Sequence, residues 1–174
     1  MSSMLITARF FVFYMGLAFA VWSDCQCRKI PNRLSVIMAI AGIILALFGG
    51  TLMIKQAGVG FLCGLGLGIA LWLLCVVRAG DAKLMAAIGA LMGGRWLLNV
   101  FTWALLVGIL LGVVILLYKH ELGSRLGRLW NYGKSLIYSQ HFSVYKPEEG
   151  SEGELPFAVP LFIGAVLTAW YRLW

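Results

Sequence analysis

The sequence predicts an all-α, polytopic membrane protein with about six transmembrane helices and its N-terminus outside. First, 61% of the 174 residues are hydrophobic and only 12% are charged, a balance far from that of a soluble domain. Second, several uncharged apolar runs approach or exceed the roughly 20 residues that a helix needs to cross a bilayer. We therefore treat residues 1–174 as a single integral-membrane domain whose solvent is the bilayer.

Six apolar segments make up most of the chain. The first covers 4–22 and contains Arg9, whose long side chain can extend to the membrane surface. The others are predicted at 34–54, 57–77, 84–94, 96–118 and 155–171. The run at 84–94 is short, because a helix of that length rises only about 16 Å. We expect this helix to begin earlier and to include Asp81 to Lys83.

The distribution of basic residues indicates that the short segment crosses the membrane, since cytoplasmic loops are enriched in Lys and Arg. If it crosses, ten of the 14 basic residues fall on one side of the membrane, and if it does not, the split is seven to seven. The four on the opposite side are then Arg9, Lys55, Arg95 and Arg172. This topology places the N-terminus outside and a loop at 119–154 in the cytoplasm.

Net charge, the 119–154 loop and the cysteines indicate which partners and cofactors to expect. The net charge of +7 is attributed to basic loops facing anionic lipid, so the bilayer is a predicted partner and nucleic acid is not. The 119–154 loop begins with a pattern typical of a basic amphipathic helix on the cytoplasmic leaflet and ends in a polar linker. No metal or other cofactor is predicted, and the four cysteines are expected to be free thiols: Cys25, Cys27, Cys63 and Cys75.

A glycine repeat lies in the third apolar segment. Gly60, Gly64 and Gly68 recur every four residues and therefore share one face of a helix. Small residues on such a face let the backbones of two membrane helices approach closely. We predict close helix packing along this stripe.

The acidic residues fall into two groups. All five glutamates lie in the 119–154 loop, whereas Asp24 and Asp81 each lie at a membrane boundary, on the predicted cytoplasmic side. An ionisable group at such a position marks a candidate functional site, because a charge near hydrocarbon is costly. Two carboxyls in one low-dielectric site can share a single proton, which is the state needed to activate water and to protonate a carbonyl.

Composition alone leaves other functions open. Asp24 could be a helix-end acid paired with Arg28 or Lys29, and Asp81 could be a helix N-cap. The same two acids would also suit a small proton-coupled transporter or channel, or a sparse divalent-metal site. The sequence contains no motif of a serine or zinc hydrolase.

Three stretches resemble the type IV prepilin peptidase family, the GxGD-type membrane aspartyl proteases. Asp24 with the following segment RKIPNR at 28–33 is similar to the region of that family's first aspartate. GDAKLMAAIG at 80–89 is similar to the second aspartate motif, although Arg78 stands where that motif has its first glycine. LPFAVP at 155–160 is similar to the entry to the family's last helix.

The resemblance implies a membrane aspartyl endopeptidase of the bacterial inner membrane, active in pilus biogenesis and protein secretion. It would remove the leader peptide of type IV pilin-like precursors at the cytoplasmic face, with Asp24 and Asp81 as the catalytic pair. The implied supporting residues are Gly80, Lys83, Lys29, Pro31 and Asn32. Larger members carry a cytosolic insertion with paired C-x-x-C motifs. This chain has none and resembles the small, cleavage-only members that serve tight-adherence (Flp) pili.

Overall fold

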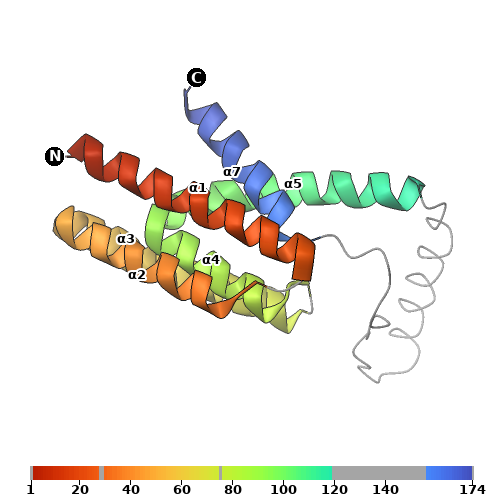
Figure 1. Ribbon diagram of the computed structural model, residues 1–174, viewed down its shortest axis with the longest axis horizontal. Helices are drawn as coiled ribbons and strands as arrows, with labels where there is room; N and C mark the ends of the chain where they lie inside the picture. The colour runs from red at the N-terminus through yellow and green to blue at the C-terminus, as the bar shows by residue number, and fades with distance from the viewer. Residues whose placement is uncertain (1, 28–29, 75, 119–155, 174) are drawn as a thin grey trace. The chain divides into compact units, whose positions relative to one another are not determined.

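A computed structural model of the protein describes residues 2–27, 30–74, 76–118 and 156–173. All regular secondary structure in these ranges is helical, which confirms the predicted all-α class. The helices in Figure 1 are α1 (Ser2–Cys27), α2 (Asn32–Phe48), α3 (Thr51–Leu73), α4 (Ala79–Met92), α5 (Gly94–Tyr118) and α7 (Ala158–Leu173). The amphipathic helix and linker predicted at 119–154 lie outside the described residues.

The chain forms two compact units. The first comprises residues 1–107 and 156–174, and the second comprises residues 108–155. The first unit therefore contains α1 to α4, the N-terminal part of α5, and α7, whereas the described part of the second is the C-terminal end of α5. The six predicted site residues that the structure describes all belong to the first unit.

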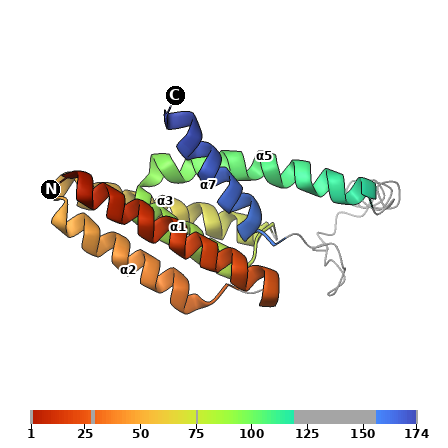
Figure 2. The ribbon, with the colours of Figure 1, turned by 45° about the horizontal axis from the view of Figure 1, so that its top comes forward.

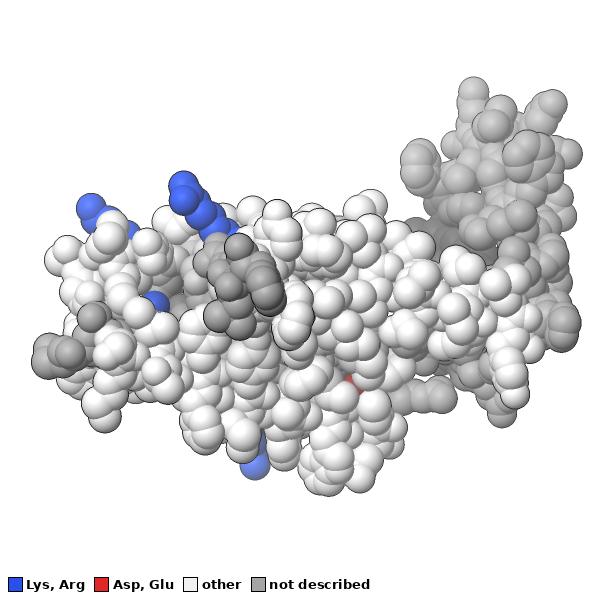
Figure 3. Space-filling model, turned by 90° about the horizontal axis from the view of Figure 1, so that it is seen from above, with Lys and Arg blue, Asp and Glu red and all other residues white. Residues whose placement is uncertain are grey.

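By length and composition, three helices are able to cross a membrane: Ser3–Cys27, Thr51–Leu73 and Gly94–Ile115. Two further apolar helices, α2 and α7, are shorter. Large apolar side chains point outward from the long helices; Leu62 of α3, for example, is 67% exposed. On the face seen in Figure 3 the described side chains are almost all uncharged, and acidic atoms appear at one small spot. Such a surface is suited to lipid and indicates a membrane protein.

The short helix α4 is the buried centre of the first unit. Ten of its 14 residues are buried, among them Leu84, Met85 and Ile88. It contacts α3 and α2 extensively and also touches α1, while α1, α2 and α3 run alongside one another (Figures 1 and 2). The helix includes Asp81 to Lys83, as predicted. Because its neighbours supply an apolar environment, α4 needs less length than a helix that faces lipid.

The glycine stripe of α3 brings α3 and α4 into backbone contact. Gly60, Gly64 and Gly68 are all buried. A methyl group added at Gly64 would clash with the carbonyl oxygen of Met85. At Gly68 it would lie only 2.7 Å from the Cα of Ala82. The close helix packing predicted from the glycine repeat is therefore confirmed.

The predicted boundary between the second and third helices is wrong. The apolar pattern places it at Lys55, whereas α2 ends at Phe48 and α3 begins at Thr51. The chain turns at Gly50, whose φ of 90° is a backbone conformation that favours glycine. Lys55 is exposed in the second turn of α3, where water can solvate its charge without interrupting the helix.

Replacing Gly64 with alanine is expected to lower the free energy of unfolding by about 1–3 kcal/mol, because the new methyl overpacks the α3–α4 contact. Gly66 is the matched control, since a methyl there meets no atom within 4 Å. Gly66→Ala should be neutral or stabilising by up to about 1 kcal/mol, because alanine favours the helix. Thermal unfolding in detergent measures both changes. Equal effects of the two substitutions would contradict close packing at the stripe.

Candidate active site

Asp24 lies in the last turn of α1 and is only 4% exposed. Its Oδ2 accepts a hydrogen bond of 3.2 Å from the backbone N–H of Ala158, the first residue of α7. The N–H groups in the first turn of a helix have no partner within that helix, and they form the positive end of its dipole. The carboxyl of Asp24 thus satisfies one of these donors, and the start of α7 orients the carboxyl.

Asp81 lies in the first turn of α4 and is 5% exposed. Its Oδ2 accepts a hydrogen bond of 3.0 Å from the backbone N–H of Arg78, the N-cap residue. An acid in the third helical position that bonds back to the N-cap N–H stabilises a helix start. Asp81 is therefore not the N-cap considered from the sequence, because Arg78 holds that position, but from the third helical position it does stabilise the helix start. That role occupies only one of its two carboxyl oxygens.

The two carboxyls lie close enough to interact electrostatically. The negative charge of Asp24 acts on the carboxyl of Asp81, and the positive charge of Arg78 acts on it in the opposite sense. The oxygen that a backbone N–H holds is the Oδ2 in both aspartates. Two like charges in a site shielded from water repel, and a proton held between them relieves the repulsion. Burial and proximity together therefore make Asp24 and Asp81 one electrostatically coupled site.

Two further contacts join the segments that carry the aspartates. The Nζ of Lys83 donates a hydrogen bond of 3.0 Å to the Oδ1 of Asn32, which ties the N-terminal part of α4 to the first residue of α2. Gly80 lies against the buried Ile30, whose Cβ would be 3.5 Å from a methyl group on Gly80. The predicted supporting residues Gly80, Lys83 and Asn32 therefore lie beside the aspartate pair, and they hold α2 and α4 together there.

Pro31 fixes the entry into α2. It is the N-cap residue, with φ of −62°, and its carbonyl accepts a hydrogen bond of 3.0 Å from the N–H of Leu34. The proline ring restricts φ to this range and so helps to place Asn32. Lys29, predicted as a supporting residue, and Arg28, considered as a partner of Asp24, lie outside the described residues.

Metal-binding side chains do not cluster in the described part of the chain, where no three His, Cys, Asp or Glu residues come together. Cys25, Cys27 and Cys63 are free thiols, as predicted, and Cys75 is not among the described residues.

Two positions that hold the site were not identified from the sequence. One is the backbone N–H of Ala158, which orients Asp24, and the other is the side chain of Ile30, which packs under Gly80. For Ala158 the signal is the stretch LPFAVP at 155–160, whose proline at 156 is typical of the region where a helix begins. For Ile30 the signal is an apolar residue within a basic segment.

These features define an all-helical membrane protein with two buried, interacting carboxyls where helices begin and end. A profile of the type IV leader peptidase family matches residues 11–113, which are more than half of the chain and include both aspartates. The chain belongs to this family and is therefore a leader peptidase-like protease. Comparison with curated proteins and with solved structures found no match.

Replacing Ala158 with proline is expected to reduce leader-peptide removal about tenfold, because it deletes the N–H that orients Asp24. Proline is tolerated at the first position of a helix, so α7 should persist. Ala158→Val is the matched control, since it adds bulk at the same buried position and keeps the N–H. Equal activity losses in the two variants, measured on a pilin precursor, would show that bulk rather than the hydrogen bond matters.

Proposed function

We propose that this protein is an aspartic-type prepilin leader peptidase that acts at the cytoplasmic face of the bacterial inner membrane. The observation that carries the proposal is the convergence of Asp24 and Asp81. Both are nearly buried, they interact electrostatically, and each is held through one oxygen by a backbone N–H. The family match favours peptide hydrolysis over the transporter or channel that the same two acids would also suit.

The two carboxyls would act as a general base and a general acid on water and the peptide. The ionised carboxyl takes a proton from water as the water oxygen attacks the scissile carbonyl carbon, while the protonated carboxyl donates to the carbonyl oxygen. In the collapse of the tetrahedral intermediate, the C–N bond breaks and the amine receives a proton from the pair. A hydroxyl of the intermediate returns one proton. The pair then again holds one proton, and it titrates as a unit.

The hydrogen bonds that hold one oxygen of each aspartate support this mechanism. Anchoring one Oδ2 to Ala158 and the other to Arg78 fixes the carboxyl planes, so little reorganisation is needed when a peptide binds. In this mechanism the Oδ1 atoms, which these two hydrogen bonds do not involve, would face water and substrate.

The substrate would be a pilin-like precursor of the Flp type, with a basic leader followed by an apolar helix in the bilayer. Its cleavage site would lie at the membrane boundary, at the depth proposed for Asp24 and Asp81. The apolar helix would approach laterally, and the exposed Trp22, two residues before Asp24 in α1, offers apolar surface there. The scissile bond must be unwound first, because a helix engages its own carbonyls in hydrogen bonds.

Asp24→Asn and Asp81→Asn should each reduce leader removal at least about 100-fold, because each removes one partner of the acid–base pair. Inverted membrane vesicles that contain each variant are mixed with a membrane-inserted pilin precursor, and gel mobility reports loss of the leader. Glu148→Gln and Glu149→Gln are the matched controls, since they make the same acid-to-amide change in the loop, and they should keep near-normal activity.

Near-normal cleavage by either aspartate variant would overturn the two-aspartate mechanism. Sealed right-side-out vesicles test the side of the membrane. Cleavage of a precursor supplied from outside, with none in inverted vesicles, would overturn the cytoplasmic placement.

A further inference from the structure

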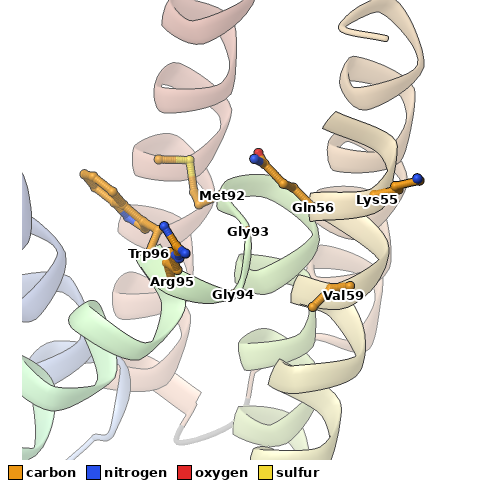
Figure 4. A pocket seen from close by; sticks show the side chains of 8 residues that line it. All are labelled: Lys55, Gln56, Val59, Met92, Gly93, Gly94, Arg95 and Trp96. Atoms are coloured by element: carbon orange, nitrogen blue, oxygen red, sulfur yellow. The ribbon is translucent and has the colours of Figure 1, made fainter. Parts of the chain in front are cut away.

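A basic hollow lies at the turn between α4 and α5, at the opposite end of α4 from Asp81. Its volume is about 570 Å³, and the residues lining it include Lys55, Gln56, Gly94 and Arg95 (Figure 4). This size is within the range of small-ligand sites, about 300–1,000 Å³. The 14 residues of α4 rise about 20 Å. The hollow is therefore remote from the aspartate pair and is not explained by peptide hydrolysis.

Positive charge and hydrogen-bond donors gather around this hollow. Helix α5 begins at Gly94, so the N–H groups of its first turn lack intrahelical acceptors and carry the positive end of the helix dipole. Arg95 lies in the same turn, and its planar guanidinium suits two-point binding of phosphate. From α3, Gln56 reaches toward Met92, while Lys55 extends outward at the rim (Figure 4).

Arg9 of α1 is a second, independent indication of an anion. It lines a smaller hollow of about 150 Å³ that shares Met92 and Trp96 with the larger one. Its Nε and Nη2 atoms are buried and have no hydrogen-bond partner among the described residues. Arg9 as a whole is partly buried, but these two nitrogens are shielded from the water that would bind them, and leaving them without an acceptor is costly.

No described acid lies at this end of α4 to balance these cations. The described residues include only two acids, Asp24 and Asp81, because all five glutamates fall within 119–155. Asp81 is at the far end of α4, and Asp24 interacts with it there. A bound anion would supply the acceptor oxygens that the described residues do not.

The surroundings favour an anion that carries apolar chains. Val59, which lines the hollow, is 58% exposed, and Leu98, one turn into α5, is 51% exposed. Trp96 packs edge-on against Phe10, with ring centroids 5.2 Å apart, and tryptophan is enriched where membrane meets water. We propose that the hollow binds the phosphate group of an anionic phospholipid whose acyl chains lie along α3 and α5. The guanidinium of Arg95 suits such a head group, because arginine forms charge-assisted, two-point hydrogen bonds with phosphate.

Native mass spectrometry of the full-length protein in detergent tests the lipid site. Phosphatidylglycerol and phosphatidylcholine with identical acyl chains are the probes, and the anionic lipid should bind more tightly. Arg95→Gln should weaken phosphatidylglycerol binding about tenfold, because charge-assisted hydrogen bonds to phosphate are lost. Arg95 is exposed, so the fold should tolerate the change. Arg33→Gln, the same change at an exposed arginine of α2 outside the hollow, should leave binding unchanged.

Three results would overturn the proposal. Equal affinity for the two lipids would exclude recognition of an anionic head group. If the Arg33 and Arg95 variants lost the same amount of phosphatidylglycerol binding, the lipid would be attracted by the net charge of the protein and would not be bound in this hollow. Inorganic phosphate is the third probe, and binding as tight as that of phosphatidylglycerol would assign the hollow to free phosphate. Because lipid binding is measured without a peptide substrate, none of these results bears on the aspartate pair.

Discussion

The burial of a 14-residue helix among longer neighbours is the constraint on which the rest of this structure depends. Helix α4 is too short to cross a hydrocarbon core of about 30 Å unaided, and it begins with an acid. It is accommodated because α1, α2 and α3 surround it and because glycines at 64 and 68 let its backbone meet that of α3. The depth of Asp81 is therefore set by helix packing and not by a loop.

The packing of α4 also explains why three distant segments meet. Asp81 is held by the N-cap N–H of its own helix, while Asp24 is held by the start of α7, 134 residues further along the chain. Lys83 and Asn32 join the same end of α4 to α2. Each carboxyl uses one oxygen to satisfy a backbone N–H at a helix start, and in the proposed mechanism the other oxygen exchanges protons.

Hydrophobic length predicted the helices well, because a run of apolar residues is readable along a single chain. Hydrophobic length alone predicts the break between α2 and α3 at Lys55, but the turn forms at Gly50, because Gly50 adopts a positive φ and the exposed Lys55 is accommodated within α3. Asp24 and Asp81 were located as candidates because acids are rare outside the loop. The N–H of Ala158 was not predictable, since every residue except proline has one and its partner depends on tertiary packing.

A chemical cross-link between positions 24 and 81 tests the shared site most directly. In a variant whose four cysteines are serines, Asp24→Cys combined with Asp81→Cys should be joined by a short bis-thiol reagent. Asp24→Cys combined with Gly94→Cys should not, because Gly94 lies about 20 Å away along α4. Mass spectrometry of the intact protein measures the bridge. No bridge between 24 and 81, although each single cysteine reacts, would contradict a shared site, as would equal bridging of the two pairs.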